Sequence, residues 1–402
     1  MSISLKIDKV RTLIRNNGLL GSAKKVFGYV QKYRSAFVVA PGDILFVASG
    51  VGDSAHFRAW NVAEELQLHG FRASVTIVDN PNLLKLVDEF KIFIFHKTVY
   101  SEKIAKVVEK IKAQKKEIIF DTDDLNFDPE YLTQMDYFKN AGEAEKMQLA
   151  KGLGREILED DYVKVATTTT TYLAKILEQK GKKVFVVKNK ISNAELEIAN
   201  KLWGLGKKPK DSFVYLGYFS GTPSHNKDFA TITDALLAVM RKYKNAKLIL
   251  AGPLDQENTL NELGNRIITL PLVPRGKHYE NIQKADINLV PLEGTPFCEA
   301  KSELKFFEAG ILGIPTVAKR NETFSGTIED GATGFLAGNE LEWMEKLGQL
   351  IEDQKLRKAM GERAREKTRK DYTNKNSHSE EYYNYLLLVI HICDTNKVLQ
   401  IG

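Results

Sequence analysis

Short apolar runs alternate with stretches of helical periodicity along most of this chain. From Gly42 onward, runs rich in Val, Ile, Leu and Phe are each followed by a segment whose apolar residues recur with helical spacing. In the first half of the chain the runs predict strands at Ile44–Ala48, Ser74–Val78, Ile92–Phe95, Ile118–Phe120, Val163–Ala166 and Phe185–Val187. Such alternation is typical of a parallel sheet covered by helices on both faces.

A second series of the same kind follows residues 201–211, a polar segment with Gly and Pro that we interpret as an interdomain linker. Its predicted strands are Phe213–Tyr218, Lys247–Leu250, Ile267–Leu270, Ile287–Val290 and Pro315–Ala318, and its predicted helices span about 229–243, 340–352, 355–370 and 376–389. A chain of 402 residues is also too long for one ordinary core. The pattern therefore predicts an α/β protein with two doubly wound domains in series.

The expected organisation has four parts. They are a basic, amphipathic helical extension over 1–41, a first domain over 42–205, a second domain over 206–371 and a C-terminal helical tail over 372–402 that packs back on the first domain. Residues 1–35 hold eight Lys or Arg against one Asp, so the net charge of this segment is +7. The net charge of the whole chain is +6, and the remaining residues therefore have a net charge of −1. Because the basic residues belong to an appendage, the charge argues against a nucleic-acid channel.

The basic extension suits an anionic membrane surface, or else packs on the protein with its lysines solvated. No apolar run approaches the ~20 residues that span a bilayer. The N-terminus shows no secretory signal pattern. Two cysteines make neither a disulfide framework nor a metal cluster. We expect a cytoplasmic protein, peripheral on the inner face of the membrane.

The densest candidate chemistry lies in residues 289–318, where an apolar strand leads into a loop with two lysines and a helix carrying Glu308. In open α/β sheets ligands bind beyond the carboxyl ends of the strands. A carboxylate there can accept both hydroxyls of a ribose, and Lys301 and Lys305 can neutralise a diphosphate. The alternative is a surface helix whose lysines pair with Glu299 and Glu303.

Another candidate loop follows the first strand of the second domain. Gly221 and Thr222 precede a helix start, where backbone N–H groups can approach a phosphate, and Lys227 lies within reach of it. The alternative is an ordinary loop in which Asp228 caps the helix.

Polar residues also follow strands of the first domain. His96 follows the third predicted strand, and Asp123 and Asp124 follow the fourth. We interpret the aspartates as binding hydroxyls or orienting a base, and turn or cap chemistry is the alternative. His96 is either a substrate contact or structural. Residues 167–171 are five threonines in a row and predict a helix cap.

These residues resemble glycosyltransferases of the GT-B fold, particularly family four, and the likeness is strongest over 213–335. The resemblance implies that Glu308 binds ribose and that Lys227 binds the donor diphosphate. It departs from the family at two positions. Gly221 stands where the family usually has an Arg, so Lys301 would supply the second charge. Ala300 stands where the family usually has its first glutamate, and Glu299 lies one residue away from that position.

The variant with Lys301, Ser302 and Lys305, like the Asp121–Leu125 motif, resembles a subgroup found in bacterial surface-polysaccharide clusters. The resemblance implies two Rossmann-like domains facing a central cleft, without a cofactor or metal. It further implies retaining transfer of a hexose or deoxyhexose from a nucleoside-diphosphate sugar to a glycan or lipid-linked acceptor. The implied site residues are His96, Asp123 and Asp124 for catalysis, Gly50, Gly52 and Ser54 for the cleft loop, and Gly221, Thr222, Lys227, Glu299, Lys301, Ser302, Lys305 and Glu308 for the donor.

Two alternatives remain from the sequence. A non-hydrolysing sugar-nucleotide epimerase uses a similar two-domain fold and would act without an acceptor. A non-catalytic partner with this fold would bind nucleotide or glycan without turnover.

Overall fold

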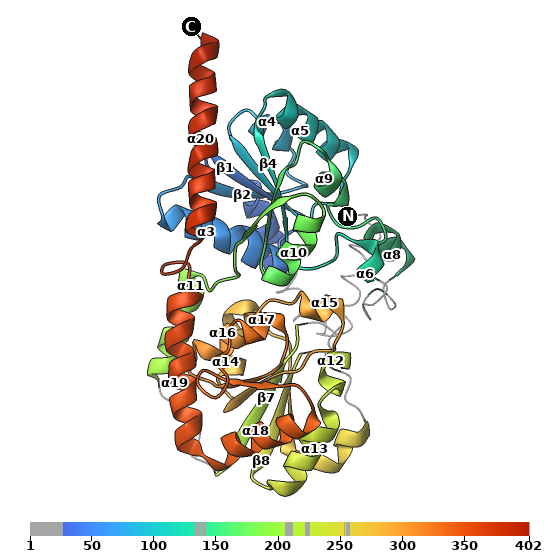
Figure 1. Ribbon diagram of the computed structural model, residues 1–402, viewed down its shortest axis with the longest axis vertical. Helices are drawn as coiled ribbons and strands as arrows, with labels where there is room; N and C mark the ends of the chain where they lie inside the picture. The colour runs from blue at the N-terminus through green and yellow to red at the C-terminus, as the bar shows by residue number, and fades with distance from the viewer. Residues whose placement is uncertain are drawn as a thin grey trace. The chain divides into compact units, whose positions relative to one another are not determined.

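The computed structural model describes residues 27–401 except 133–137, 139–141, 206–211, 222–225, 253 and 255–257. The described chain forms two compact units. Unit 1 is Met1–Val187 together with His378–Gly402, and unit 2 is Lys188–Ser377. Each unit contains one parallel sheet of six strands with helices around it (Figure 1). The fold class predicted from the sequence, two Rossmann-like α/β domains, is confirmed.

Unit 1 has the strand order β2-β1-β3-β4-β5-β6. The strands are β1 Ile44–Ala48, β2 Ala73–Ile77, β3 Ile92–His96, β4 Glu117–Thr122, β5 Val165–Thr168 and β6 Lys183–Val186. The helices are α2 Asp53–Ala55, the π-helical η1 His56–Asn61, α3 Val62–Leu68, α4 Leu83–Leu86, α5 Glu102–Ala113, α6 Pro129–Leu132, α8 Glu143–Leu149, α9 Arg155–Glu159, α10 Thr171–Gln179 and α20 Glu380–Ile401. Residues 27–35 are also helical.

Unit 2 has the strand order β12-β11-β10-β7-β8-β9. The strands are β7 Val214–Phe219, β8 Ala246–Ala251, β9 Ile267–Leu270, β10 Ile287–Val290, β11 Thr316–Lys319 and β12 Phe335–Ala337. The helices are α11 Asn193–Gly204, α12 Asn226–Ala230, α13 Thr233–Lys242, the 3-10 helix η3 Asn258–Arg266, α14 Arg275–Ile282, α15 Pro296–Glu299, α16 Leu304–Gly310, α17 Glu322–Ser325, α18 Glu340–Glu352 and α19 Gln354–Asp371.

The strand orders place one crossover reversal in each sheet. In unit 1 the chain leaves β1 for β2 on one side and returns to β3 on the other, so the reversal lies between β1 and β3. In unit 2 it lies between β7 and β10. Parallel sheets of this type bind ligands at the carboxyl ends of the strands beside such a reversal. The loops after β1, β3, β7 and β10 are therefore the places to look for a site.

The strands are continuous apolar runs because both faces of each sheet are covered. Every residue of β1 and β3 is buried, and the same holds for β10. Local signals set the helix boundaries. The Thr170 side chain accepts a hydrogen bond from the Leu173 N–H at the start of α10, so the predicted cap in the threonine run is confirmed.

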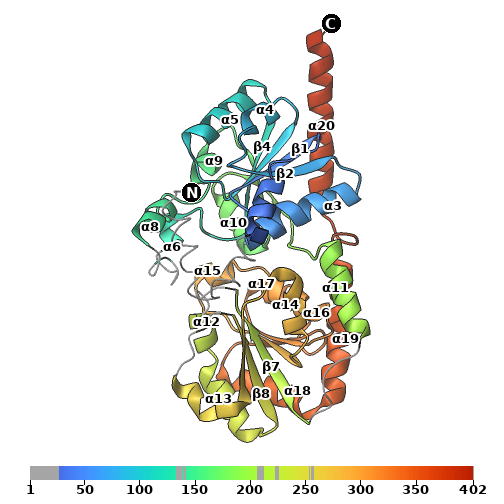
Figure 2. The same ribbon diagram turned by 180° about the vertical axis from the view of Figure 1, so that it is seen from behind.

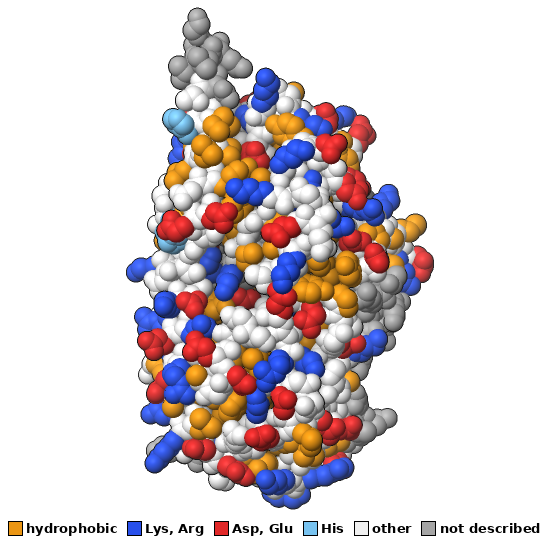
Figure 3. Space-filling model, viewed as in Figure 1, with side chains coloured by type: hydrophobic (Ala, Val, Ile, Leu, Met, Phe, Trp, Pro, Cys, Tyr) orange, Lys and Arg blue, Asp and Glu red, His pale blue; other side chains and the backbone are white. Residues whose placement is uncertain are grey.

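Helix α20 completes unit 1 although it is the last element of the chain. Tyr382, Tyr383 and Leu386 are buried in the same apolar cluster as Phe185 and Val187. Lys91 adds an ion pair to Asp394 at 2.6 Å. Both views show α20 extending past the sheet at its C-terminal end (Figures 1 and 2). Figure 3 shows apolar side chains on its exposed face, which includes Leu387 and Leu388.

The division between the units differs from the one expected at 205/206. Unit 2 begins at Lys188, and the expected linker includes the end of helix α11. Trp203 packs against the Gly313 turn, where an added Cβ would lie 2.1 Å from the indole ring. The Arg365 guanidinium stacks over the same indole at 4.7 Å. The segment was predicted as a linker because it is polar, but its first residues form the packed end of helix α11. Residues 206–211 lie outside the described part.

One strand was missed by the sequence analysis. β12 has only three residues, Phe335–Ala337, and glycines flank it at 334 and 338. So short a run between glycines carries too little periodicity to predict a strand. Among the described helices, none is long and apolar enough to cross a membrane.

Candidate functional site

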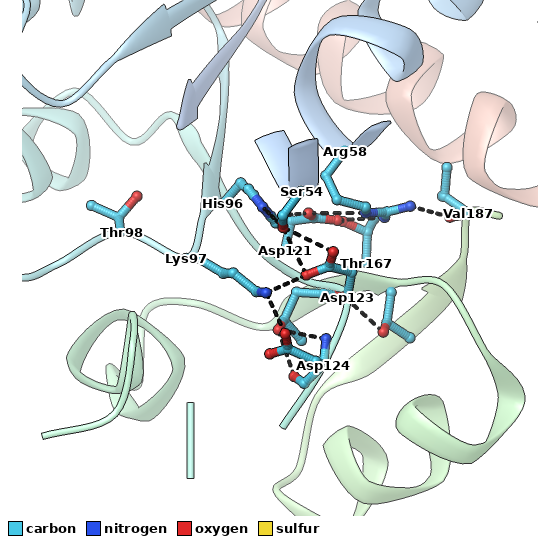
Figure 4. A network of polar contacts seen from close by, with 12 residues as sticks. Ser54, Arg58, His96, Lys97, Thr98, Asp121, Asp123, Asp124, Thr167 and Val187 are labelled. Carbon is cyan, nitrogen blue, oxygen red and sulfur yellow. Dashed lines mark hydrogen bonds and ion pairs between the residues drawn. The ribbon is translucent and has the colours of Figure 1, made fainter. Parts of the chain in front are cut away.

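Polar side chains of unit 1 converge at the carboxyl ends of β1, β3 and β4 (Figure 4). His96 ends β3, Asp121 lies near the end of β4, and Ser54 follows β1 at the start of α2. The strand register brings the first two together, because His96 pairs with Asp121 across the β3–β4 ladder. The network therefore lies beside the β1–β3 reversal, where the topology places a ligand site.

Asp121 is a buried carboxylate with three side-chain partners. Arg58 Nη2 donates to its Oδ1 at 2.6 Å, and Thr167 Oγ1 donates to the same oxygen at 2.7 Å. His96 Nδ1 contacts Oδ2 at 2.8 Å. Burial alone would raise the pKa of Asp121, but the Arg58 guanidinium and His96 hold it below its ordinary value. Arg58 also donates to the Val187 carbonyl, which fixes its orientation.

Lys97 bridges the other two aspartates. Its Nζ lies 2.5 Å from Asp123 Oδ1 and 2.5 Å from Asp124 Oδ2. Lys97 is buried and has a positive φ of 47°, which is uncommon for a residue with a side chain. Asp124 also accepts the Asn126 N–H at 2.9 Å, so part of its role is the turn chemistry named as the alternative.

Ser54 connects the aspartates to the histidine. Its Oγ lies 2.8 Å from His96 Nε2 and 2.8 Å from Asp123 Oδ2. Gly50 and Gly52 precede it in the loop after β1, and an added Cβ at either glycine would meet open space. The glycines therefore leave room beside Ser54 without being required by backbone crowding.

The structure thus brings the predicted residues His96, Asp123, Asp124 and Ser54 into one network. The sequence analysis did not assign Arg58 or Lys97 a role, and it treated Thr167 only as part of the threonine run. Arg58 lies inside a predicted helix between the apolar residues Phe57 and Ala59. An arginine between apolar helix residues is the sequence signal that could have pointed to a buried, paired side chain.

In unit 2, Glu308 lies in a buried ionic cluster. Its carboxylate pairs with Arg275 through Oε1 and with His278 Nε2 at 3.4 Å through Oε2. Arg275 Nε also donates to Glu195 Oε1 at 2.6 Å. Burial alone would raise the pKa of Glu308, but Arg275 and His278 hold it below its ordinary value. The sequence analysis missed Arg275, His278 and Glu195, because α11 and α14 carry no motif.

Lys305 is one turn before Glu308 on helix α16. Part of its side chain is exposed, but its Nζ is buried and has no hydrogen-bond partner among the residues that the structure describes. The ammonium lies 4.5 Å from the centroid of the Tyr218 ring. Burial lowers the pKa of Lys305 to about 8, although Asp228 and Glu308 oppose the shift. A buried cation without a hydrogen-bonding acceptor is unfavourable unless a ligand supplies one.

The other residues predicted for the donor have contacts of their own. Lys301 Nζ stacks over the Phe297 ring at 4.2 Å, and Ser302 accepts a hydrogen bond from Asn189 at 3.1 Å. Glu299 accepts the Glu322 N–H at 3.4 Å. Gly221 is exposed after β7, and Lys227 is exposed in α12. Thr222 lies outside the described residues.

The contacts differ from the surface-helix alternative, in which lysines pair with Glu299 and Glu303. Glu303 is buried and contacts Lys188 Nζ at 3.9 Å. Asp228 is also not a helix cap. It is buried inside α12, where it accepts the Glu293 N–H at 3.0 Å and the Cys298 S–H at 3.3 Å.

Asp228, Glu293 and Cys298 form one group whose ligand atoms lie within 4.8 Å of one another in the described part of the chain. Burial raises the pKa of the Cys298 thiol to about 12, so this sulfur is protonated and donates to Asp228. These contacts tie the β10–α16 loop to α12, which is a structural role.

A family comparison gives a match in unit 2. Residues 206–367 match the family model described as glycosyl transferases group 1. This range contains Lys227, Arg275, Lys305 and Glu308. Among curated proteins, none is significantly similar to the chain in sequence.

Solved structures resemble the whole chain. HepE of Anabaena, in complex with UDP, is 14% identical with a TM-score of 0.54 over 90% of this chain and 100% of its own. Sucrose-phosphate synthase of Thermosynechococcus elongatus is 14% identical with a TM-score of 0.56 over 89% and 99%. TarM of S. aureus, in complex with fondaparinux, alpha-GlcNAc-glycerol and UDP, is 14% identical with a TM-score of 0.51 over 77% and 57%. The chain therefore has the fold of the GT-B glycosyltransferases, and its second unit matches glycosyl transferases group 1.

Proposed function

We propose that this protein is a glycosyltransferase that moves a hexose or deoxyhexose from a nucleoside-diphosphate sugar to a glycan or lipid-linked glycan. The family match of residues 206–367 supports the reaction class. The ligands of similar structures, UDP for HepE and UDP with alpha-GlcNAc-glycerol for TarM, support a nucleotide donor and a glycan or glycerol acceptor. A place in bacterial surface-polysaccharide synthesis follows from the resemblance of the lysine-rich loop.

The observation that carries the proposal is the buried ammonium of Lys305, which has no hydrogen-bond acceptor in the described part of the chain. It lies at the carboxyl end of the unit 2 sheet, one turn from Glu308 and close to Asp228 on α12. A diphosphate oxygen would give this ammonium the acceptor that it lacks. Lys301 and Lys227 would stabilise the remaining charge as the diphosphate leaves, so the chain's own cations serve where other enzymes use a metal.

Two further parts of the proposal rest on resemblance. Retention at the anomeric carbon follows from the likeness to family four. Ribose binding by Glu308 also follows from it, and it requires the ribose hydroxyls to share or replace the contacts of Arg275 and His278.

A calorimetric screen of UDP, GDP and dTDP tests the donor site. We expect one diphosphate to bind, and Glu308→Gln to weaken that binding at least tenfold, or about 1.4 kcal/mol, because the amide loses the ionic cluster that fixes the site. Glu340→Gln, on the exposed start of α18, is the matched control and should bind as the wild type. Binding that is identical in the wild type and Glu308→Gln would contradict the assignment.

We further propose that the protein works at the inner face of an anionic membrane. The helical residues 27–35 support this, because Phe27 is 72% exposed and Tyr29 and Val30 are also exposed. Lys32 and Arg34 are exposed on the same helix. Tyr33 ties the helix to unit 1 through Asp79. Residues 1–26, which hold most of the basic charge, lie outside the described residues.

Co-sedimentation with lipid vesicles tests this surface. The full chain should bind vesicles containing phosphatidylglycerol and not vesicles of phosphatidylcholine alone, because binding combines apolar insertion with charge attraction. Phe27→Ser combined with Val30→Ser should reduce binding about tenfold. Leu272→Ser, at an exposed position of unit 2, should not. Equal binding to both lipids would refute the membrane proposal.

A further inference from the structure

The network at the end of β3 and β4 fixes where its protons lie. Burial would raise the pKa of Asp123, but the Lys97 ammonium holds it well below its ordinary value. Asp121 is likewise held below its ordinary pKa by the Arg58 guanidinium. Both side chains are therefore carboxylates, which only accept hydrogen bonds.

Ser54 has one hydroxyl proton, and its neighbours determine where that proton points. Asp123 lies 2.8 and 3.0 Å from Oγ through its two oxygens, and a carboxylate at that distance must receive the proton. The 2.8 Å contact between Ser54 Oγ and His96 Nε2 then requires the histidine to donate. On the other side of the ring, Nδ1 lies 2.8 Å from Asp121 and also donates. Both ring nitrogens therefore carry protons.

The surrounding charges agree with this assignment. The charged and titratable groups of the network around His96 are Asp121 from β4, Arg58 from η1, Lys97 directly after β3, and Asp123 and Asp124 from the loop after β4. The Tyr382 phenol from α20 lies near Asp121 and Arg58. Three carboxylates stand against two permanent cations. A neutral His96 would leave one negative charge uncompensated in a buried network, and an imidazolium balances it.

Exposure divides the roles within the network. The His96 side chain is 1% exposed and lies behind Ser54, whereas the Asp123 side chain is 16% exposed. A ligand can therefore reach Asp123 and Ser54 but not the imidazole ring. Figure 4 shows Ser54 between the ring and Asp123.

We infer that His96 is a buried imidazolium that directs the Ser54 hydroxyl to Asp123, and that Asp123 accepts a hydrogen bond from a substrate hydroxyl. His96, Ser54 and Lys97 are then positioning residues. The identity of the hydroxyl as a sugar hydroxyl rests on the proposed transfer function. Because a carboxylate with so low a pKa is a weak base, Asp123 orients the hydroxyl and does not deprotonate it.

Nitrogen-15 NMR of the full chain labelled at its seven histidines tests the inference without any sugar. His96→Asn identifies the His96 signals. At neutral pH, both His96 nitrogens should show attached protons in the wild type. In Asp123→Asn the network has one carboxylate fewer, and Ser54 is free to donate to Nε2, so the protonated fraction of His96 should fall. Asp53→Asn, at an exposed position beside Ser54, is the matched control and should leave the His96 signals unchanged.

A singly protonated His96 ring in the wild type would overturn the inference, and so would an unchanged ring in Asp123→Asn. In transfer assays, Asp123→Asn should raise KM for the hydroxyl-bearing substrate it contacts by about tenfold, because one charge-assisted hydrogen bond is lost. An unchanged KM would show that Asp123 does not contact the substrate. A chain that transfers no sugar but shows the doubly protonated ring would refute the proposed function and leave the charge assignment intact.

Discussion

Replacing Lys305 by methionine is expected to make the protein more stable and to slow sugar transfer strongly. Within residues 27–401, leaving out the undescribed gaps, its buried ammonium has no hydrogen-bond partner, and burial lowers its pKa to about 8 from 10.5. That difference corresponds to roughly 3 kcal/mol of unfavourable free energy in the folded state. Methionine has a similar length and no charge, so Lys305→Met should raise the free energy of unfolding by an amount of this order.

The stability gain should depend on pH in a defined direction. Between pH about 8 and 10.5 the folded chain binds fewer protons at Lys305 than the unfolded chain does, so the stability of the wild type rises with pH there. The advantage of Lys305→Met should therefore be full below pH 8 and shrink as the pH approaches 10.5. Urea unfolding at several pH values measures it.

The same variant should transfer sugar about 10²–10³-fold more slowly, as expected for the loss of one group that stabilises developing charge. Lys301→Met is the matched control for stability, because Lys301 is half-buried and its ammonium already stacks on Phe297. It should change the free energy of unfolding much less. A Lys305→Met protein that is less stable, or that turns over at the wild-type rate, would rule out the anion-site assignment.

Arg58→Met is expected to produce the largest loss of stability in unit 1. The Arg58 and Asp121 side chains are only 1% and 2% exposed, and Arg58 Nη2 donates to Asp121 at 2.6 Å. Removing one partner of such a pair leaves a buried charge uncompensated, which costs about 3–5 kcal/mol. The network at the ends of β3 and β4 would also lose the cation that fixes Asp121, and Asp121 is the residue that contacts His96 Nδ1.

The measurement is urea unfolding followed by circular dichroism, with Arg155→Met as the control. Arg155 pairs with Glu159 on the surface of the same unit, where side-chain exposures are 45% and 54%. Breaking such a pair should change the free energy of unfolding by less than about 1 kcal/mol. Similar losses in both variants would show that the buried pair contributes no more than a surface one.

The sequence predicted the parts of the fold that depend on continuous apolar runs. Strands such as Ile44–Ala48 and Ile287–Val290 coincide with the structure because both their faces are buried. The boundary between the units was not predictable in this way, because Trp203 and Arg365 meet only after folding. Composition alone made the segment before residue 206 look like a linker.

The candidate sites show the same limit. His96, Asp123 and Ser54 were predicted because each follows a strand, and parallel strands end at a common edge. Arg58 and Arg275 approach those sites from helices, with no spacing rule that links them to Asp121 or Glu308. Whether Glu308 binds ribose stays a prediction, since its present partners belong to the chain itself.

The return of α20 to unit 1 has a consequence for biosynthesis. The core of unit 1 includes Tyr382 and Leu386, which are translated after the whole of unit 2. On the ribosome, residues 188–377 are therefore complete before the first half of the chain can bury Phe185 and Val187 fully. The N-terminal half must wait with part of its apolar surface uncovered, and a fragment that stops at Val187 would lack a piece of its own interior.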